Sequence, residues 1–513
     1  MRLAKNGIGL FLFSFLLFSV LVHDGASAPD NVCTPKFTDT SPGNLKIFDA
    51  HVHVTSDYTS DFVISEMDQA GVSMALLYPD NDARSLNYIA QYPGRFSTFV
   101  AFPDNPPWLD GGQQFIDHVK TQLDTGRFTG IGEINLRYYN GASYTPPPDI
   151  YVQPDTPLML QVVNLSAIYR VPISFHFVPD DPVANAALER MFSYNENATF
   201  IWSHLGFNNM PLNADTLDYY LMRYPNLYLD TAGIQNMMND PGALNSNWRG
   251  VFVNQTDGRL NARWKEFFET WNSRILWATD AGGGNDPKRW FNYANNTVQD
   301  APPNAVGRWR SALATLDSNA VRNVFSANAR AVILKEARPA YDYSVASNGK
   351  CFPVTVNSNS SVSALDFDQA TNTITFKTAD SSGTTGSAAV SIPTGLLNGT
   401  FTVQVNGHNV QFGETISPAY ANLRITYGGG VNLIAVTATP SVNPTSQNPS
   451  PTPQPTATAA PTVAATNQAT AIASVNPNTQ ANGFGWVPIV GVVAVIAVIA
   501  AVYFVTRKPP NRR

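Results

Sequence analysis

The chain has 513 residues, of which 44% are hydrophobic and 14% are charged, and its formal net charge is −6. This length exceeds one ordinary domain, so we expect two folded units together with accessory segments. The acidic balance and the lack of a Lys/Arg run in the foldable part of the sequence argue against a nucleic acid as partner.

Residues 1–28 have the layout of a secretory signal peptide. Arg2 and Lys5 precede an apolar run from Ile8 to Val22, and the small-residue motif Ala26-Ser27-Ala28 follows. Pro29 disfavours cleavage directly after this motif, so an uncleaved N-terminal anchor is the alternative, although the apolar run is short for a membrane span. Asn-x-Ser/Thr sequons are compatible with export and glycosylation, and they occur at Asn164, Asn197, Asn254, Asn295, Asn359 and Asn398.

Residues 29–344 alternate short β-branched runs with helical patterns, which is typical of repeated βα units and a parallel sheet. Eight units of this kind favour an α/β fold, a closed TIM-like (β/α)8 barrel. An open doubly wound sheet is the alternative, but no Gly-rich phosphate loop follows the first strand to support it. The expected strands are Leu45–Val54, Val72–Tyr78, Phe96–Phe102, Thr129–Leu136, Val171–Phe177, Thr199–Leu205, Leu227–Thr231 and Arg274–Asp280. Helices are expected at Ser60–Ala70, Thr156–Arg170 and Ser318–Leu334.

Two cysteines flank the predicted barrel. Cys33 precedes the first expected strand, and Cys351 follows the last expected helix. Because the ends of a domain often lie close together, a Cys33–Cys351 disulfide would close the fold, and the chain-entropy model gives it about 4–5 kcal/mol. The alternative is two unrelated thiols, since the sequence does not fix the separation of their Cα atoms.

Residues 345–437 change to strand-like alternation without helical patterns. Alternating runs lead into Asn406-Gly407, a strong hairpin signal, and Leu423, Ile425 and Tyr427 alternate further on. This segment predicts a small all-β sandwich domain.

The remaining residues predict a membrane tether. Residues 438–482 form a Pro/Ser/Thr-rich stalk without charged residues, which cannot bury enough surface to fold. Residues 484–506 form an apolar transmembrane helix, and the basic tail at 507–513 places the barrel outside the cell. A sorting signal that is exchanged for a lipid anchor is the alternative at this end.

Six side chains occupy the C-terminal ends of the expected barrel strands. His51 and His53 point to the same side of the first strand because they are two residues apart. In a barrel, side chains at the C-terminal ends of different strands meet around one cavity. The sequence therefore predicts one metal site built from His51, His53, Glu133, His176, His204 and Asp280.

The motif Asp49-Ala50-His51-Val52-His53, the two later strand-end histidines and the strand-eight aspartate resemble the amidohydrolase superfamily, closest to its amidohydrolase-related branch. The resemblance extends from Leu45 to Leu334 and includes Asn328-Ala329-Arg330 in the last helix. It implies that His51, His53 and His176 are metal ligands and that Asp280 is both ligand and proton shuttle. His204 is either a second-metal ligand or a group that polarises the substrate.

Glu133 departs from the decarboxylases of that branch, which hold one metal and have no strand-four ligand. Its setting, Gly-Glu-Ile-Asn-Leu, is similar to that of the deoxyribonuclease-type hydrolases, in which a strand-four glutamate joins two metals. Alternatively, Glu133 orients a ligand histidine. Asp230, which closes the seventh strand, is interpreted as a helix cap rather than a pocket residue.

These residues predict a metal-dependent hydrolase that cleaves a C–N, C–O or P–O bond of a small substrate outside the cell. The nitrogen-rich ligand set favours one or two zinc ions without excluding manganese or iron. Arg137, Tyr138 and Phe177 are expected to border the substrate pocket. The alternatives are a mononuclear decarboxylase or hydratase of a small carboxylic acid and a non-catalytic binding protein. The sequence makes no prediction of oligomeric state.

Overall fold

A computed structural model describes residues 33, 45–102, 112–139, 147–206, 213–234, 238, 252–254, 256–282 and 305–440. The predicted signal peptide, nearly all of the predicted stalk, the predicted transmembrane helix and the basic tail lie outside these residues. Within the described part of the chain, none of the helices combines the length and the apolar character needed to cross a membrane.

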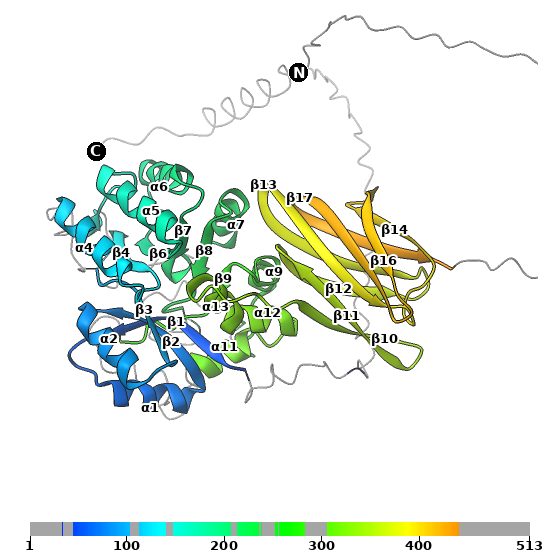
Figure 1. Cartoon of the computed structure of the whole chain (residues 1–513), viewed down its shortest axis with the longest axis horizontal. Helices are drawn as coiled ribbons and strands as arrows, with labels where there is room; N and C mark the ends of the chain where they lie inside the picture. Colours follow the sequence, from blue (N-terminus) through cyan, green and yellow to red (C-terminus); the bar gives the residue numbers. More distant parts are fainter. Residues whose placement is uncertain are drawn as a thin grey trace, which may run out of the picture. The chain divides into compact units, whose positions relative to one another are not determined.

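Parallel strands and intervening helices make up the described part of the chain before residue 340 (Figure 1). β1, β2 and β3 form one sheet, and β4, β6, β7, β8 and β9 form a second sheet, to which the short antiparallel strand β5 (Ile150–Tyr151) is added. The parallel strands are β1 (Ile47–Val54), β2 (Val72–Pro79), β3 (Phe96–Thr98), β4 (Ile131–Tyr138), β6 (Pro172–Phe177), β7 (Thr199–Trp202), β8 (Leu227–Asp230) and β9 (Ile275–Leu276).

The two sheets are joined at both edges. A parallel bridge between Val100 and Ile131 links the end of β3 to β4, and a second between Val52 and Ala281 links β1 to the residues after β9. The Ala50 amide also donates to the Trp277 carbonyl at 3.0 Å. The parallel strands therefore follow one another around a ring, which is consistent with the predicted TIM-like domain and not with an open sheet.

The helices lie around the outside of these strands (Figure 1). The local sequence explains both ends of α1. The Thr59 side chain accepts a hydrogen bond from the Phe62 amide at its start, and Gly71 takes the left-handed conformation after its end. The helices are α1 (Ser60–Ala70), α2 (Asp82–Gln91), α4 (Gly112–Asp124), α5 (Pro157–Tyr169), α6 (Pro182–Tyr194), α7 (Ala214–Arg223), α9 (Ala262–Thr270), α11 (Ala305–Ala312), α12 (Ser318–Arg322) and α13 (Asn328–Ile333). The predicted helix at 318–334 is continuous, but a π-helical turn, η5 (Asn323–Ala327), joins α12 to α13.

Several predicted strands end earlier than expected; β3, for example, stops at Thr98 and not at Phe102. The strand predicted to reach Leu205 stops at Trp202, because His204 and Leu205 take left-handed backbone conformations in the turn η2 (Ser203–Gly206). The strand predicted to reach Asp280 is only two residues long, and Asp280 itself has φ = 60°. Left-handed residues cannot continue an extended strand, and such conformations in non-glycine residues concentrate at functional sites.

Residues 341–439 form the predicted all-β domain, here called the β domain. Its strands belong to one hydrogen-bonded sheet, because β13 and β17 are long enough to pair along its whole extent. The hairpin at Asn406-Gly407 forms as predicted, with Val405 paired to His408. The strands are β10 (Tyr341–Ser347), β11 (Lys350–Ser358), β12 (Ser361–Asp368), β13 (Thr373–Pro393), β14 (Thr400–Val405), β15 (His408–Asn409), β16 (Phe412–Ile416) and β17 (Tyr420–Thr439).

The barrel and the β domain are joined by buried polar contacts around Asn272, which precedes β9. Its side-chain amide donates to the Val362 carbonyl at 3.0 Å, and its oxygen accepts from the Tyr341 hydroxyl at 3.1 Å. The hydroxyls of Ser273 and Ser361 are 2.7 Å apart. These hydrogen bonds cross between the two domains and hold the chain just before β9.

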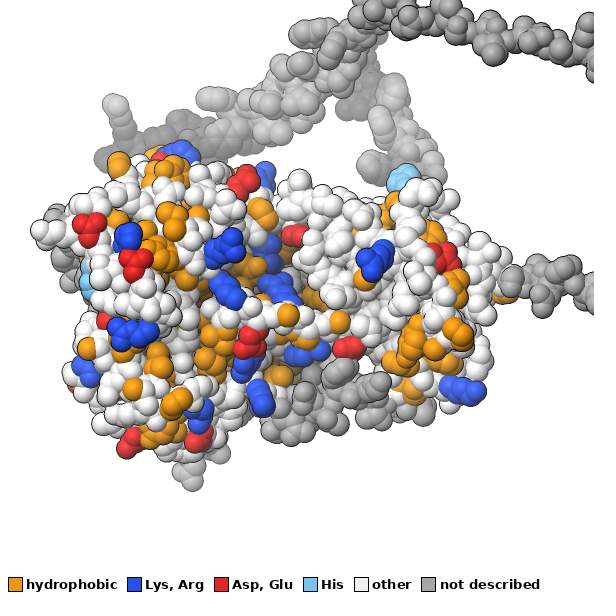
Figure 2. All heavy atoms as spheres, in the orientation of Figure 1, with side chains coloured by type: hydrophobic (Ala, Val, Ile, Leu, Met, Phe, Trp, Pro, Cys, Tyr) orange, Lys and Arg blue, Asp and Glu red, His pale blue; other side chains and the backbone are white. Residues whose placement is uncertain are grey.

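Charged side chains of both signs are interspersed over the face shown in Figure 2. Several exposed charges form neighbouring pairs, such as Lys120 with Asp124 and Arg84 with Asp80, one helical turn apart. Exposed pairs of this kind contribute little to stability. The stability of the molecule therefore depends mainly on its two large apolar cores, one in the barrel and one in the β domain.

Cys33 and Cys351 form a disulfide with their Cα atoms 5.5 Å apart, which ties the segment before β1 to β11 of the β domain. We expect the double variant Cys33→Ala/Cys351→Ala to lower the free energy of unfolding by roughly 2–5 kcal/mol, because the crosslink closes a long loop and restricts the unfolded chain. Urea denaturation without reductant measures the difference. Reductant should destabilise the wild-type chain and leave the variant unchanged; an equal effect on both would contradict the prediction.

Candidate metal centre

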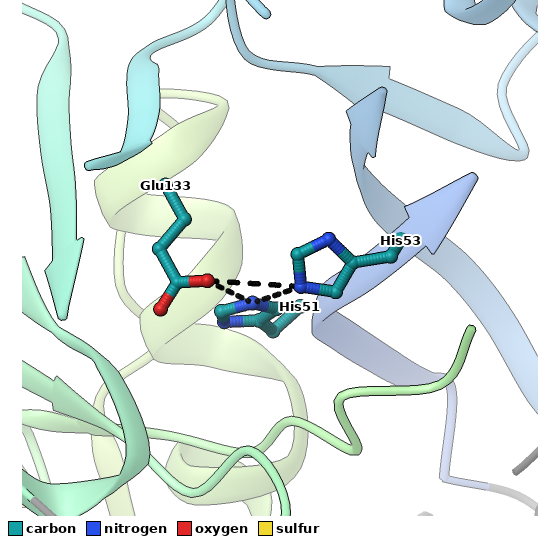
Figure 3. Close-up of side chains that lie close together, drawn as sticks. All are labelled: His51, His53 and Glu133. Carbon is teal, nitrogen blue, oxygen red and sulfur yellow. Dashed lines mark hydrogen bonds and ion pairs between the residues drawn. The ribbon is translucent and has the colours of Figure 1, made fainter. Parts of the chain in front are cut away.

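β1 presents His51 and His53 to the same side, and the Nε2 atoms of their rings lie 3.1 Å apart (Figure 3). The carboxylate of Glu133, from β4, faces both rings. Its Oε2 atom lies 3.4 Å from His51 Nε2 and 3.7 Å from His53 Nε2. His51 is fully buried, whereas the His53 side chain is 24% exposed, so the group opens towards solvent on the His53 side.

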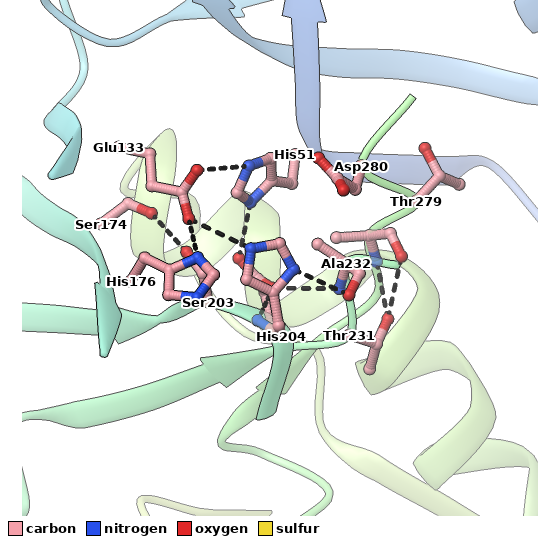
Figure 4. A network of polar contacts seen from close by, with 12 residues as sticks. His51, Glu133, Ser174, His176, Ser203, His204, Thr231, Ala232, Thr279 and Asp280 are labelled. Carbon is pink, nitrogen blue, oxygen red and sulfur yellow. Dashed lines mark hydrogen bonds and ion pairs between the residues drawn. The ribbon is translucent and has the colours of Figure 1, made fainter. Parts of the chain in front are cut away.

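The other oxygen of Glu133 faces a second pair of histidines (Figure 4). Glu133 Oε1 lies 3.2 Å from His204 Nε2, on the turn after β7, and 3.5 Å from His176 Nδ1, near the end of β6. The Glu133 side chain is only 9% exposed. One buried carboxylate therefore lies between two pairs of imidazoles, with one oxygen towards each pair.

These side chains fit divalent metal ions. In a tetrahedral site with metal–ligand distances of 2.0–2.2 Å, the ligand atoms are roughly 3.3–3.6 Å apart. The nitrogen–oxygen separations of 3.2–3.7 Å about Glu133 lie close to this range. Among the residues that the structure describes, two groups have ligand atoms close enough for an ion: His51, His53 and Glu133, and Glu133, His176 and His204. Nitrogen and carboxylate donors of this kind suit zinc and related ions.

Asp280 lies beside the first group. Its Oδ1 atom is 3.3 Å from His53 Nε2, and its backbone amide donates to the His51 carbonyl at 3.0 Å. The left-handed backbone of Asp280 turns the chain immediately after β9. The carboxylate thus stands where it can accept a proton from a molecule held by His53 and its neighbours.

Burial and the neighbouring charges shift the pKa values of the site residues in opposite directions. Burial disfavours a charged ring at His51, but the carboxylates of Glu133 and Asp230 outweigh it, and the pKa of His51 lies well above its usual value. Burial likewise disfavours an ionised Glu133, but the histidines, His51 foremost, hold the pKa of Glu133 well below its usual value. Glu133 is therefore ionised at neutral pH and presents two negatively charged oxygens to a cation.

The two histidines of the second group differ in their ionisation. Burial lowers the pKa of His176, and its contact with Glu133 opposes this only in part. At His204 burial also disfavours the charged ring, but the contact with Glu133 outweighs it and the pKa is raised. His176 is therefore the readier of the two to be neutral, as a metal ligand must be.

Asp230, at the end of β8, is part of the site, and its interpretation as a helix cap is wrong. It is fully buried. Its Oδ2 atom is 3.0 Å from His51 Nδ1, and its Oδ1 atom accepts from the backbone amides of His204 at 2.8 Å and Ala232 at 3.0 Å. Its place at the end of a strand, at the same edge as the other site residues, was the available sequence signal.

Asp49 is another carboxylate near the site, and its role was not predicted from the sequence. Its Oδ1 atom accepts from the backbone amides of His51 at 3.2 Å and Thr279 at 3.0 Å, and its Oδ2 atom accepts from the Thr279 hydroxyl at 2.5 Å. Asp49 therefore joins β1 to the residues that carry Asp280.

Of the three residues expected to border the pocket, only Tyr138 lies at the site, with its ring edge-on to His176 at 5.0 Å. Arg137 is buried in an ion pair with Asp180, its Nε 2.6 Å from Oδ1, and the register of β4 against β6 shifts between Asn135 and Arg137. Phe177 is 1% exposed and packs in the core. The structure therefore does not bring Arg137 or Phe177 to the candidate ligands.

Gly132 lets β4 approach β6 closely. Its φ is +125°, and a Cβ atom there would lie 2.3 Å from the Ser174 carbonyl oxygen. We expect Gly132→Ala to destabilise the fold by about 2–4 kcal/mol and to displace Glu133, which would lower metal content. Urea denaturation and elemental analysis measure the two effects.

Gly94→Ala is the matched control for Gly132→Ala. Gly94 also has a positive φ, +78°, but a Cβ atom there would meet nothing within 4 Å. Gly94→Ala should therefore cost only the left-handed conformation, roughly 1–2 kcal/mol, and leave metal content unchanged. Equal loss of metal in both variants would contradict the role given to Gly132.

A surface groove of about 760 Å³ runs between α6 and α7, away from the candidate ligands. Its polar groups are largely satisfied within the protein, since the hydroxyls of Tyr219 and Tyr224 both donate to the Glu189 carboxylate. The groove therefore offers no reactive group comparable with those at the strand ends.

One family model and several solved structures are similar to this chain. The family model described as Amidohydrolase matches residues 50–333. No curated protein matches the chain. Among solved structures, a glycoside hydrolase family 30 subfamily 8 xylanase from Clostridium acetobutylicum is 8% identical, with a TM-score of 0.21, 76% of this chain covered and 96% of that chain covered. A family 36 α-galactosidase from Geobacillus stearothermophilus is also 8% identical, with a TM-score of 0.22 and coverage of 76% and 55%.

Structural similarities at this level inform neither the fold nor the site. The family model, in contrast, covers more than half of the chain and includes all six residues predicted to form the metal site. The chain belongs to the amidohydrolase family.

Proposed function

We propose that the protein is a hydrolase that uses two divalent ions, zinc by preference, to cleave a C–N, C–O or P–O bond of a small substrate. The observation that carries the proposal is the position of Glu133, whose two oxygens each face a different pair of histidines. A mononuclear decarboxylase site has no need of a carboxylate at this position.

His51 and His53 would hold one ion and His176 and His204 the other, with Glu133 shared between them. The Nδ1 atom of His204 is 3.0 Å from the Ala232 carbonyl, which can only accept, so Nδ1 carries the proton. In a neutral ring, Nε2 then has no proton to donate to a substrate. This favours His204 as a metal ligand over a substrate-polarising group.

When bound, the ions would supply a water of lowered pKa and polarise the carbonyl or phosphoryl oxygen of the substrate. Asp280, beside His53, would accept the proton from that water and return it to the leaving group. Tyr138, whose ring lies edge-on to His176, would border the space for the substrate. The burial of Glu133 and His51 would keep bulk water from the inner side of the site.

We further propose that the enzyme is displayed on the cell surface through residues 484–506, with the catalytic domain outside. The signal-like N-terminus and the apolar C-terminal segment support this location. The Cys33–Cys351 disulfide supports it independently, because disulfides persist in oxidising compartments.

Elemental analysis of the purified full chain, combined with a panel of lactone, ester, amide and phosphodiester substrates, tests the function. We expect about two ions per chain and turnover of at least one substrate class. Asp280→Asn should lower kcat by about 10²–10⁴-fold with little change in KM, since it removes proton transfer but leaves the shared Glu133 group. One ion per chain together with release of carbon dioxide from a small acid would overturn the proposal.

A further inference from the structure

We infer that Asp230 is a positioning residue that decides which nitrogen of His51 faces the metal and, through the same carboxylate, aligns His204 in the other metal group. This rests on the proposed metal site. Asp230 belongs to neither of the groups that could hold an ion, so its effect is exerted through the histidines.

The contacts of His51 leave Nε2 as the nitrogen for a metal, because the carboxylate near Nε2, Glu133 at 3.4 Å, belongs to the same candidate ligand group, whereas Asp230 at Nδ1 does not. Its Nδ1 atom is 3.0 Å from Asp230 Oδ2, and its Nε2 atom is 3.1 Å from His53 Nε2. An ionised carboxylate only accepts, so in the neutral ring Nδ1 carries the proton and Nε2 keeps its lone pair. The atom that faces Glu133 and His53 is thus the one able to bind a metal.

The second oxygen of Asp230 acts on His204 through the backbone. Oδ1 accepts from the amides of His204 and Ala232, at 2.8 and 3.0 Å. These bonds hold the left-handed backbone of His204, whose φ is 60°. The Ala232 carbonyl in turn lies 3.0 Å from His204 Nδ1, so Nε2 of His204 is also left to face Glu133. One carboxylate therefore prepares a ligand nitrogen in each metal group.

Asp230→Asn should lower the affinity for metal more than Asp230→Ala. In Asp230→Asn, two backbone amides require the single amide oxygen, so the NH2 group faces His51 Nδ1 and donates to it. Nδ1 must then accept, which moves the proton of His51 to Nε2, directly in front of the metal position. In Asp230→Ala, neither nitrogen of His51 is constrained, so the metal-binding tautomer stays accessible.

Fold stability should follow the opposite order. Asp230→Asn keeps acceptance from both backbone amides, whereas Asp230→Ala leaves two buried amide donors without this partner. A merely structural Asp230 would make alanine the worse substitution for both stability and metal binding. A positioning role and a merely structural role of Asp230 thus predict different orders of metal affinity for the two variants.

The experiment titrates the chelator-stripped full chain with Zn²⁺ and with Co²⁺, whose absorption reports coordination, and measures urea unfolding alongside. We expect Asp230→Asn to weaken metal binding at the group of His51 and His53 by about 100-fold or more, and Asp230→Ala to weaken it by about tenfold. Asp180→Asn is the matched control: Asp180 is a buried carboxylate paired with Arg137, so stability should fall while both metal affinities stay unchanged.

Metal binding by Asp230→Asn that equals or exceeds that of Asp230→Ala would overturn this inference while leaving the proposed function intact. A wild-type chain that binds neither ion would overturn both. Loss of metal in Asp180→Asn to the same extent would also overturn the inference, because the effect would then follow from stability alone.

Discussion

Glu133→Gln is expected to reduce the metal content from about two ions per chain to none and to lower kcat/KM by on the order of 10³-fold or more. The amide has no charge, and only one of its two terminal atoms can bind a cation. The other would direct N–H groups at one pair of histidines, which lie 3.2–3.7 Å from the present carboxylate oxygens. Elemental analysis and steady-state kinetics measure the two effects.

Glu66→Gln is the matched control for this variant. Glu66 lies on α1, is 4% exposed, and its burial raises its pKa, but it belongs to neither group that could hold an ion. Its replacement should leave metal content and turnover unchanged. A Glu133→Gln chain that retains a single ion and its activity would favour the mononuclear decarboxylase-like site instead.

Asn272→Ala is expected to lower the free energy of unfolding by about 3–5 kcal/mol, because it leaves several buried partners without a hydrogen bond. The Asn272 amide donates to the Glu269 and Val362 carbonyls at 2.8 and 3.0 Å. Its oxygen accepts from Asn323 Nδ2 at 2.9 Å and from the Tyr341 hydroxyl at 3.1 Å. Urea denaturation followed by fluorescence measures the change.

The backbone of Asn272 also lies close, along the chain, to the strand that leads to the metal site. Asn328 Nδ2 donates to the backbone carbonyls of Asn272 and Ile275, so these contacts fix the start of the short strand β9 that leads to Asp280. We therefore expect the barrel and the β domain to unfold in one transition. Asn409→Ala, which removes an exposed amide, is the control and should change little. Two separate transitions, with the barrel unaffected, would contradict the prediction.

The order of the parallel strands and the positions of the ligands could be predicted because both depend on local pattern. Alternating strand and helix periods locate the strands, and the rule that strand ends share one face of a barrel brings His51, Glu133 and His176 together. The left-handed backbones of His204 and Asp280 could not be predicted. They depend on the hydrogen bonds that the His204 amide donates to Asp230 and the Asp280 amide donates to the His51 carbonyl, which exist only in the folded chain.

Other differences between the predictions and the structure have similar physical causes. Arg137 and Phe177 follow or end strands in the sequence, but the direction of a side chain depends on the register of its strand, which the sequence leaves open by one residue. In the β domain, Ser381-Ser382-Gly383 is a typical turn sequence, yet β13 continues through it with a register shift between Asp380 and Thr385. The length of β13 and β17 was not predicted, because strands of 20 or 21 residues are uncommon.

The contact of Asp49 with Thr279 bears on when the proposed ions could bind. The two residues are 230 positions apart in the sequence, and contacts so distant in sequence form late in folding. His51 and His53 follow Asp49 directly, on the strand that this contact places. We therefore expect a metal to bind only when the barrel is nearly complete, and not to organise an early nucleus as it does in small zinc domains.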